Sequence, residues 1–253
     1  EIDDSVKTIE SLTTYPSILG GRVKTLHPKV FGGILGRLQN EKDVEEMKQY
    51  EIPAFDLVIV DLYPYEETVK KTDDPAQIIE KIDIGGISLI RAGAKNFNEV
   101  VIVPDSKYYL EFMELYKNQN GCTTIEDRKR FAKYAFATSS HYDGMIYDWF
   151  AKDDDASDLN IHIDNRSELR YGENPHQKAV FYGKLDDVFE KLHGKDLSYN
   201  NLLDLEAGLN LIREFEEPTF AILKHNNPCG IASRTTIAEA YQAALAGDPV
   251  SAF

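Results

Sequence analysis

The chain has 253 residues, 42% of them apolar, and a formal net charge of −15 that comes from 28 basic and 43 acidic side chains. This apolar content supports packed cores and argues against intrinsic disorder, and the negative charge argues against nucleic acid as a partner. No apolar run approaches the ~20 residues needed to cross a bilayer, and no basic and apolar leader is visible, so we expect a soluble, cytoplasmic protein.

The ends and the cysteines of the sequence add two expectations. The chain begins at Glu1 without a methionine and stops at Phe253 directly after a helical pattern, so we expect a fragment of a longer protein. Its only two cysteines, Cys122 and Cys229, are distant in sequence, which defines no disulfide framework and suits a reducing compartment.

The first part of the chain predicts an α/β domain. Residues 55–62 (FDLVIVDL) are apolar and β-branched almost throughout, which is typical of a strand buried on both faces of a parallel sheet. The elements expected after it are a helix over 75–82, a helix over 87–97, a strand over 100–103 and helices over 108–117 and 124–149. Strand, helix and strand in this order indicate the α/β class.

Apolar and aromatic residues recur at three- and four-residue steps in the last of these helices. They predict a face packed in the core: Phe131, Tyr134, Ala135, Thr138, Tyr142, Met145 and Trp149.

The segment 152–158 (KDDDASD) is acidic and aperiodic, which predicts a linker and, at about 150 residues per domain, two domains over 1–155 and 166–253, joined by 156–165. In the second domain we expect a strand over 179–182, an amphipathic helix over 205–215 and a buried strand over 218–223. A turn rich in Pro and Gly then leads to a helix over 236–246.

A first candidate site is the segment 20–29 (GGRVKTLHPK), which carries three fixed positive charges and no acid. Paired glycines let the backbone approach a ligand, Arg22 can hold a phosphate with two hydrogen bonds, Lys24 adds a point charge and Thr25 a hydroxyl. The segment therefore predicts an anion site, and the alternative is an exposed basic loop.

A second candidate is the segment 83–96 (DIGGISLIRAGAKN), in which we expect Asp83 at the end of a strand, then a Gly-Gly turn and a helix start that attracts anions. Ser88, Arg91 and Lys95 share one helix face. The alternative is an ordinary turn followed by a solvated basic stripe.

A third group of candidates follows the strand 55–62. Asp61 and Tyr63 stand at its carboxyl end, where α/β folds place ligands. A tyrosine next to proline can equally be structural.

Two polar segments stand out in the second domain. Residues 169–177 (LRYGENPHQ) are dense in polar and turn residues. Residues 224–230 (KHNNPCG) follow a buried strand, where a lysine beside His225 favours neutral imidazole as a base and can stabilise an oxyanion. Pro228-Cys229 matches half of a zinc-deaminase pattern, but the second cysteine and the His-x-Glu element are missing, so we expect no metal.

Taken in order, Arg22-Val23-Lys24-Thr25-Leu26-His27-Pro28, Asp83 to Asn96, Leu169 to Gln177 and Lys224 to Gly230 resemble the bifunctional purine-biosynthesis family that combines AICAR transformylase and IMP cyclohydrolase. The resemblance covers nearly the whole chain. It implies a methylglyoxal-synthase-like domain that closes 5-formamido-imidazole-carboxamide ribotide (FAICAR) to IMP. It also implies the start of a cytidine-deaminase-like domain that transfers formyl from 10-formyltetrahydrofolate to AICAR.

The resemblance also implies roles for individual residues. In the first domain Tyr63, Asp83 and Lys95 would handle protons or polarise bonds. In the second, Lys224 and His225 would act in formyl transfer. Substrate contacts are implied for Arg22, Val23, Lys24, Thr25, Asp61, Leu62, Ile84, Gly85, Gly86, Arg170 and Tyr171.

Three further expectations accompany the resemblance. Family members form dimers with shared transformylase sites, which implies a homodimer. Relatives commonly carry Asn where Asp61 stands, and a carboxylate cannot donate a hydrogen bond as an amide does. Because we expect parts of both domains to be absent, this polypeptide alone should be weakly active or inactive.

The alternative function is a non-catalytic nucleotide-binding or regulatory module, since methylglyoxal-synthase-like domains also bind effectors. The hypothesis that the chain is part of an enzyme requires a particular arrangement of its side chains. The ammonium of Lys95 should approach Asp83 and Tyr63, and the imidazole of His225 should be accessible.

Overall fold

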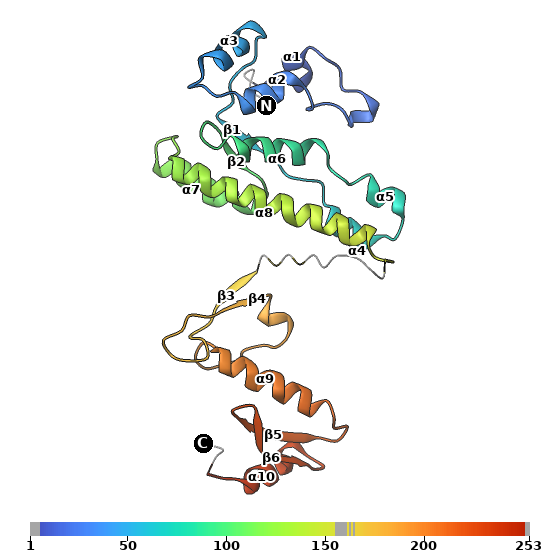
Figure 1. The fold of residues 1–253 in the computed structure, drawn as a ribbon. Coiled ribbons are helices and arrows are strands. Elements are labelled where there is room, and N and C mark those ends of the chain that lie inside the picture. The colour runs from blue at the N-terminus through green and yellow to red at the C-terminus, as the bar shows by residue number, and fades with distance from the viewer. Residues whose placement is uncertain (1–5, 155–160, 162, 164, 251–253) are drawn as a thin grey trace. The chain divides into compact units, whose positions relative to one another are not determined.

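The computed structural model describes residues 6–154, 161, 163 and 165–250. The chain forms two compact units, one over 1–162 and one over 163–253 (Figure 1). Most of the linker predicted over 156–165 lies outside the described residues. None of the helices in the described part of the chain is both long enough and apolar enough to span a membrane.

The first unit contains a small parallel sheet, in agreement with the predicted α/β class. Strand β1 (Leu57–Ile59) pairs in parallel with β2 (Val101–Val103), with Val58 opposite Ile102. The strand predicted over 55–62 is thus much shorter, and its burial on both faces is wrong, because Leu57 and Ile59 are 38% and 50% exposed. Among the described residues β1 pairs with β2 alone, so its other edge has no covering strand.

Helices surround this sheet and make up most of the unit. Their bounds are α1 Ile9–Thr13, α2 Pro28–Leu35, α3 Glu41–Gln49, α4 Tyr65–Lys71, α5 Pro75–Ile79, α6 Gly85–Lys95, α7 Tyr109–Asn118 and α8 Ile125–Phe150, with 3-10 turns η1 Leu19–Gly21 and η2 Ser106–Tyr108. The sequence analysis missed α1 to α4. Their local signals are caps such as Asn40, which accepts hydrogen bonds from the backbone N–H groups of Lys42 and Asp43.

The core of the first unit lies where α6 and α8 pack on β2 (Figure 1). Ile90 of α6, Ile102 of β2 and Ala135 of α8 are fully buried there. The predicted aromatic face of α8 is confirmed, since Phe131 and Tyr142 are buried. A capping box between Thr124 and Asp127 begins this helix at the predicted place.

The start of α6 differs from the prediction. Gly85 and Gly86 are its first two residues instead of a turn before it, and Asp83 follows the short helix α5 instead of a strand. The Asp83 carboxylate accepts a hydrogen bond from the Gly86 N–H at 2.6 Å. That bond satisfies one of the helix's unpaired donors, so the helix can begin at the glycines.

The described residues of the second unit form two antiparallel strand pairs and two long helices. Strand β3 (Arg166–Glu168) pairs with β4 (Val180–Tyr182), and β5 (Thr219–Lys224) pairs with β6 (Asn227–Ser233). The 3-10 turn η3 spans Leu185–Asp187, and the helices are α9 (Tyr199–Ile212) and α10 (Ile237–Gly247).

Two predictions for this unit need correction. The helix predicted over 205–215 begins six residues earlier, because a capping box between Ser198 and Asn201 starts it. The Pro and Gly turn predicted at 226–230 is misplaced, because the turn consists of His225 and Asn226, and residues 227–230 are part of β6. Pro228 is tolerated in that strand because it stands at a shift of register between Ile222 and Leu223 of the facing strand.

Candidate active sites

The first candidate site lies at the N-terminal end of α6. A Cβ atom built on Gly85 would stand 2.8 Å from Oγ1 of Thr25, so the Thr25 hydroxyl lies against the first residue of the helix. The Asp83 carboxylate lies beside the next residue through its bond to Gly86. Two segments that the sequence analysis singled out separately therefore meet at a helix N-terminus, where a hydroxyl, a carboxylate and backbone N–H groups are close together.

The hydroxyl of Tyr142 on α8 hydrogen-bonds the backbone at Asp83 and at Lys81. The Tyr142 hydroxyl accepts a hydrogen bond from the Asp83 N–H at 2.7 Å and donates one to the Lys81 carbonyl at 2.8 Å. Burial raises the pKa of Tyr142 to about 12, and the negative charge of Asp83 adds to the shift. The neutral phenol is therefore part of the structure that fixes Asp83.

This pKa predicts a loss of stability in alkali. Below pH ~10 the Tyr142 phenol is neutral in both states, so its contribution is complete. Between about pH 10 and 12 the unfolded chain releases the proton while the folded chain retains it, which lowers the free energy of unfolding by up to about 3 kcal/mol. Urea unfolding across this range should show the loss. The slope should be shallower in Tyr142→Phe and unchanged in Tyr50→Phe, whose side chain is 59% exposed. Equal slopes in all three proteins would contradict the prediction.

The residues after β1 have separate surroundings. Tyr63 is 57% exposed, and the ammonium of Lys81 lies 5.5 Å from its ring centroid, which places Tyr63 beside the segment that leads into Asp83. Asp61 instead accepts a hydrogen bond of 2.5 Å from the Tyr109 hydroxyl. This bond raises the pKa of Tyr109 and occupies one oxygen of Asp61. Leu62 packs against the core.

The basic segment before α2 is tied down by acidic side chains. Arg22 forms an ion pair with Glu80, and the ammonium of Lys24 lies 3.6 Å from Oε1 of Glu10. The hydrogen bond from Arg22 lowers the pKa of Glu80 and raises that of Arg22. The backbone of Val23 forms a bridge to Ile18. An anion arriving here would compete with two carboxylates.

Glu80→Gln should therefore strengthen anion binding. Removing the charge leaves Arg22 free to turn toward a ligand, and exposed pairs of this kind change affinities by roughly two- to fivefold. Isothermal titration calorimetry with a nucleoside monophosphate measures the change in affinity. Glu67→Gln is the matched control, because Glu67 forms a similar exposed pair with Lys71 at 2.9 Å on α4. Unchanged or weaker binding in Glu80→Gln would show that Arg22 does not contact the ligand.

Lys95 lies at the opposite end of α6, and this differs from the expected convergence. It is the last residue of the helix, ten positions after Gly85, which corresponds to roughly 15 Å along the axis. Arg91 lies on the same helix with its guanidinium 5.8 Å from the ring centroid of Phe136, and the Ser88 hydroxyl donates to the Ile84 carbonyl. The structure brings Asp83 and Thr25 together but does not bring Lys95 to them.

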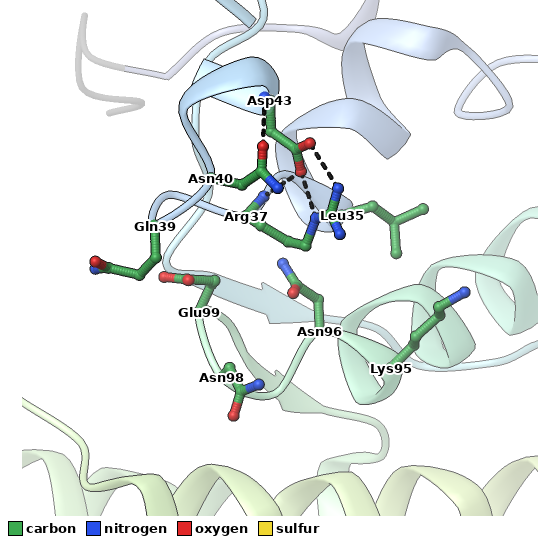
Figure 2. A pocket seen from close by; sticks show the side chains of 9 residues that line it. All are labelled: Leu35, Arg37, Gln39, Asn40, Asp43, Lys95, Asn96, Asn98 and Glu99. Atoms are coloured by element: carbon green, nitrogen blue, oxygen red, sulfur yellow. Dashed lines mark hydrogen bonds and ion pairs between the residues drawn. The ribbon is translucent and has the colours of Figure 1, made fainter. Parts of the chain in front are cut away.

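Lys95 instead lines a cavity of about 810 Å³ (Figure 2). The side chains around it are Leu35, Arg37, Gln39, Asn40, Asp43, Lys95, Asn96, Asn98 and Glu99. Figure 2 shows the Lys95 ammonium turned away from the amide of Asn96. That amide is nearly buried and donates to the carbonyls of Ile34 and Gly36, so Asn96 joins α6 to α2.

Sequence reasoning missed Arg37 at this cavity. Two hydrogen bonds of 2.7 Å join its guanidinium to the carboxylate of Asp43. A lone arginine after a helix has no local pattern that distinguishes it from a solvated one, so only the fold reveals this pair.

The second candidate site is organised by helix α9. At its first turn the Tyr199 N–H donates to the Tyr171 carbonyl at 3.1 Å, and the Asn200 amide donates to the Glu173 carbonyl at 3.0 Å. The Arg170 guanidinium lies 4.8 Å from the Tyr171 ring centroid. Hydrogen bonds from Ser198 and Arg170 lower the pKa of Tyr171. The start of α9 thus holds the segment 169–177 in place.

The same helix contacts the segment that carries Lys224 and His225. Lys224 faces Asn227 at the end of the β5–β6 hairpin, so His225 and Asn226 alone form the turn. The Asn226 N–H donates to Oδ1 of Asp204 on α9 at 2.7 Å. Lys224 and His225 are both exposed, so the imidazole is accessible, as the enzyme hypothesis requires. Asp204 and Tyr199 are five residues apart, roughly 8 Å along the helix, so one helix holds both predicted segments.

No group of three or more His, Cys, Asp or Glu side chains within the described residues is placed to hold a metal ion.

A family model described as "AICARFT/IMPCHase bienzyme" matches residues 93–253, more than half of the chain. The chain belongs to this family. The predicted membership of this family is thereby confirmed, and two of the four segments, 169–177 and 224–230, lie wholly within the matched residues.

Curated relatives extend the match over nearly the whole chain. The "Bifunctional purine biosynthesis protein PurH" of Bacteroides thetaiotaomicron is 58% identical over 98% of this chain and 48% of its own length. The protein of the same name from Rhodospirillum rubrum is 47% identical over 98% of this chain and 49% of its own length. A solved structure titled "Crystal structure of ForH" is 37% identical, covering 58% of this chain and 76% of that chain, with a TM-score of 0.48. The chain spans about half the length of these curated relatives.

Proposed function

We propose that this chain belongs to an enzyme that performs the last two steps of IMP synthesis. The two steps are formyl transfer from 10-formyltetrahydrofolate to AICAR and ring closure of FAICAR to IMP. The observation that supports this most is the arrangement around α9. One helix holds both the Arg170-Tyr171 segment and the Lys224-His225 turn, although more than fifty residues separate the two in sequence.

The ring closure is assigned to the first unit. The carboxamide nitrogen attacks the formyl carbon, loses a proton, and water leaves. A carboxylate such as Asp83 can accept the proton, while the Tyr63 hydroxyl can donate to the formyl oxygen. Arg22, Lys24 and Thr25 would bind the phosphate near the helix N-terminus at Gly85 and Gly86, with the backbone of Val23 and Ile84 nearby. Lys95 is assigned here by resemblance to the family alone, because the structure places it at the opposite end of α6 from Asp83. Asp61 and Leu62 are assigned as substrate contacts by the same resemblance.

The formyl transfer is assigned to the second unit. The 5-amino nitrogen of AICAR attacks the formyl carbon of the folate, and tetrahydrofolate leaves. His225 would remove the amine proton, and the Lys224 ammonium would stabilise the oxyanion of the tetrahedral intermediate. Arg170 and Tyr171 would bind the nucleotide. No metal is required for any of these steps.

The proposal includes the finer assignments that the family implies. Residues 1–155 would form a methylglyoxal-synthase-like domain, 156–165 a linker and 166–253 the start of a cytidine-deaminase-like domain. We also propose a cytoplasmic homodimer. Because the chain spans about half the length of its relatives, the 253-residue polypeptide alone should be weakly active or inactive.

Thermal shift with IMP, AICAR and a folate analogue tests this function. Stabilisation by nucleotide and folate together supports the enzyme, whereas stabilisation by nucleotides alone favours a regulatory module. A direct assay of the complete gene product that contains this chain is decisive. Absence of both formyl transfer and ring closure there would overturn the proposal. Formyl transfer by the 253-residue chain at the rate of the complete product would overturn the expectation of weak activity.

A further inference from the structure

The turn that carries His225 has a demanding backbone. His225 and Asn226 have φ values of +53° and +62°, both in the left-handed region, and Lys224 pairs with Asn227 across the hairpin. Two consecutive left-handed residues form the tight two-residue hairpin turn in which glycine is strongly preferred at the second position. Neither residue is glycine here. A chain that holds a histidine and an asparagine in this conformation needs contacts that stabilise it.

The structure shows two such contacts. The Asn227 amide donates to the His225 carbonyl at 2.8 Å, which closes the turn from within. The Asn226 N–H donates to the Asp204 carboxylate at 2.7 Å, which ties the turn to α9. The second bond is charge-assisted and comes from a different element, so it determines where the turn sits and not only its shape.

The hydrogen bond between Asn226 and Asp204 links the His225 turn to the helix that also contacts the Arg170-Tyr171 segment. The first turn of α9 holds Tyr171 and Glu173 through Tyr199 and Asn200. Asp204 lies about one and a half turns further along the same helix. The distance from the Arg170-Tyr171 segment to the His225 turn is therefore set by a single rigid helix, which hydrogen-bonds one segment from its first turn and the other from Asp204 near its middle.

We propose that Asp204 is a positioning residue for formyl transfer, which holds the His225 turn at a fixed distance from the nucleotide-binding segment. This inference rests on the proposed transferase function and extends it to a residue outside the four segments. Asp204 need not touch the substrate. It acts through the backbone N–H of Asn226.

Steady-state formyl transfer in the complete gene product tests the inference, with AICAR and 10-formyltetrahydrofolate as substrates. Asp204→Ala should lower kcat about tenfold and leave the KM for AICAR unchanged, because the base is misplaced while the nucleotide contacts remain. Asp204→Asn should recover most of the activity, since an amide oxygen still accepts the Asn226 hydrogen bond. Glu206→Ala, an exposed acid on the same helix, is the matched control and should leave kcat and KM unchanged.

A double variant separates positioning from a general loss of stability. Asn226→Gly relaxes the turn, because glycine adopts the left-handed conformation without strain. Adding Asn226→Gly to Asp204→Ala should therefore restore part of kcat. Hydrogen exchange at the amide of residue 226 should be fast in Asp204→Ala and slow in the wild type and in Asp204→Asn.

The outcomes are distinct. An Asp204→Ala protein with wild-type kcat, or one whose KM rises while kcat is kept, would overturn the inference. So would an Asp204→Asn protein as impaired as Asp204→Ala. A wild-type product without formyl transfer would overturn the proposed function itself, and is recognised because the defect is then present before any substitution.

Discussion

Replacement of Gly230 by alanine should lower the free energy of unfolding of the second unit by about 3 kcal/mol, the upper end of the usual cost of overpacking. A Cβ atom on Gly230 would stand 2.0 Å from the carbonyl oxygen of Ala244 and 2.8 Å from its carbonyl carbon. Both are backbone atoms of α10, so the clash cannot be relieved by a change of side-chain rotamer. Helix α10 would have to move away from β6 as a rigid body, and its buried residues Ala240 and Ala244 would lose packing contacts.

Thermal unfolding, together with hydrogen exchange resolved to residues 165–250, measures this loss. Gly208→Ala is the matched control, because Gly208 lies in the middle of α9 and a Cβ there would be 3.4 Å from Leu223 Cδ1, an ordinary contact. Alanine is the better helix former, so this control should stabilise the unit by up to about 1 kcal/mol. A Gly230→Ala protein as stable as the wild type would mean that α10 does not pack this closely on β6.

Replacement of Asp83 by asparagine should reduce ring closure by about 10²- to 10³-fold while the unit stays folded. Asparagine has nearly the same shape, and its amide oxygen can still accept the hydrogen bond from the Gly86 N–H. It carries no negative charge and cannot accept a proton, so a general base at this position would be lost. The effect on catalysis should far exceed the effect on stability.

Conversion of FAICAR to IMP by the complete gene product gives the rate, and thermal unfolding gives the stability. Asp74→Asn is a close control, since Asp74 accepts a hydrogen bond from the Ala76 N–H at the start of α5 in the same unit. It should leave the rate unchanged. If Asp83→Asn closed the ring within threefold of the wild-type rate, Asp83 would serve only to hold the start of α6.

Several elements of the fold follow from the sequence because their signals are local. Apolar and aromatic residues recur at three- and four-residue steps from Phe131 to Trp149, and this spacing predicted the long helix α8 within a residue at each end. The short apolar runs at 100–103 and 218–223 predicted β2 and β5 almost in place. Such periodic patterns depend on residues within about four positions of one another, so they can be recognised in the amino-acid sequence alone.

The same local reasoning failed where the fold overrides the pattern. Residues 55–62 resemble a strand buried on both faces, yet only three of them form β1, and its exposure depends on which strands lie beside it. Residues 226–230 resemble a turn, yet 227–230 belong to β6, because His225 and Asn226 already close the hairpin. Strand pairing joins residues that are not adjacent in sequence, so composition alone does not determine it.

The sequence by itself determined the family, and it predicted the segments to which chemistry is assigned, because both depend on the kinds of residue and their spacing along the chain. Only the tertiary structure decided how those segments combine. It placed the Thr25 hydroxyl against Gly85, set Glu80 against Arg22, and separated Lys95 from Asp83 by the length of α6. It also showed α9 joining Tyr171 to the His225 turn through Tyr199 and Asp204. Each of these relations depends on the packing of helices whose residues lie far apart in sequence, and a rigid helix fixes distances that no local pattern encodes.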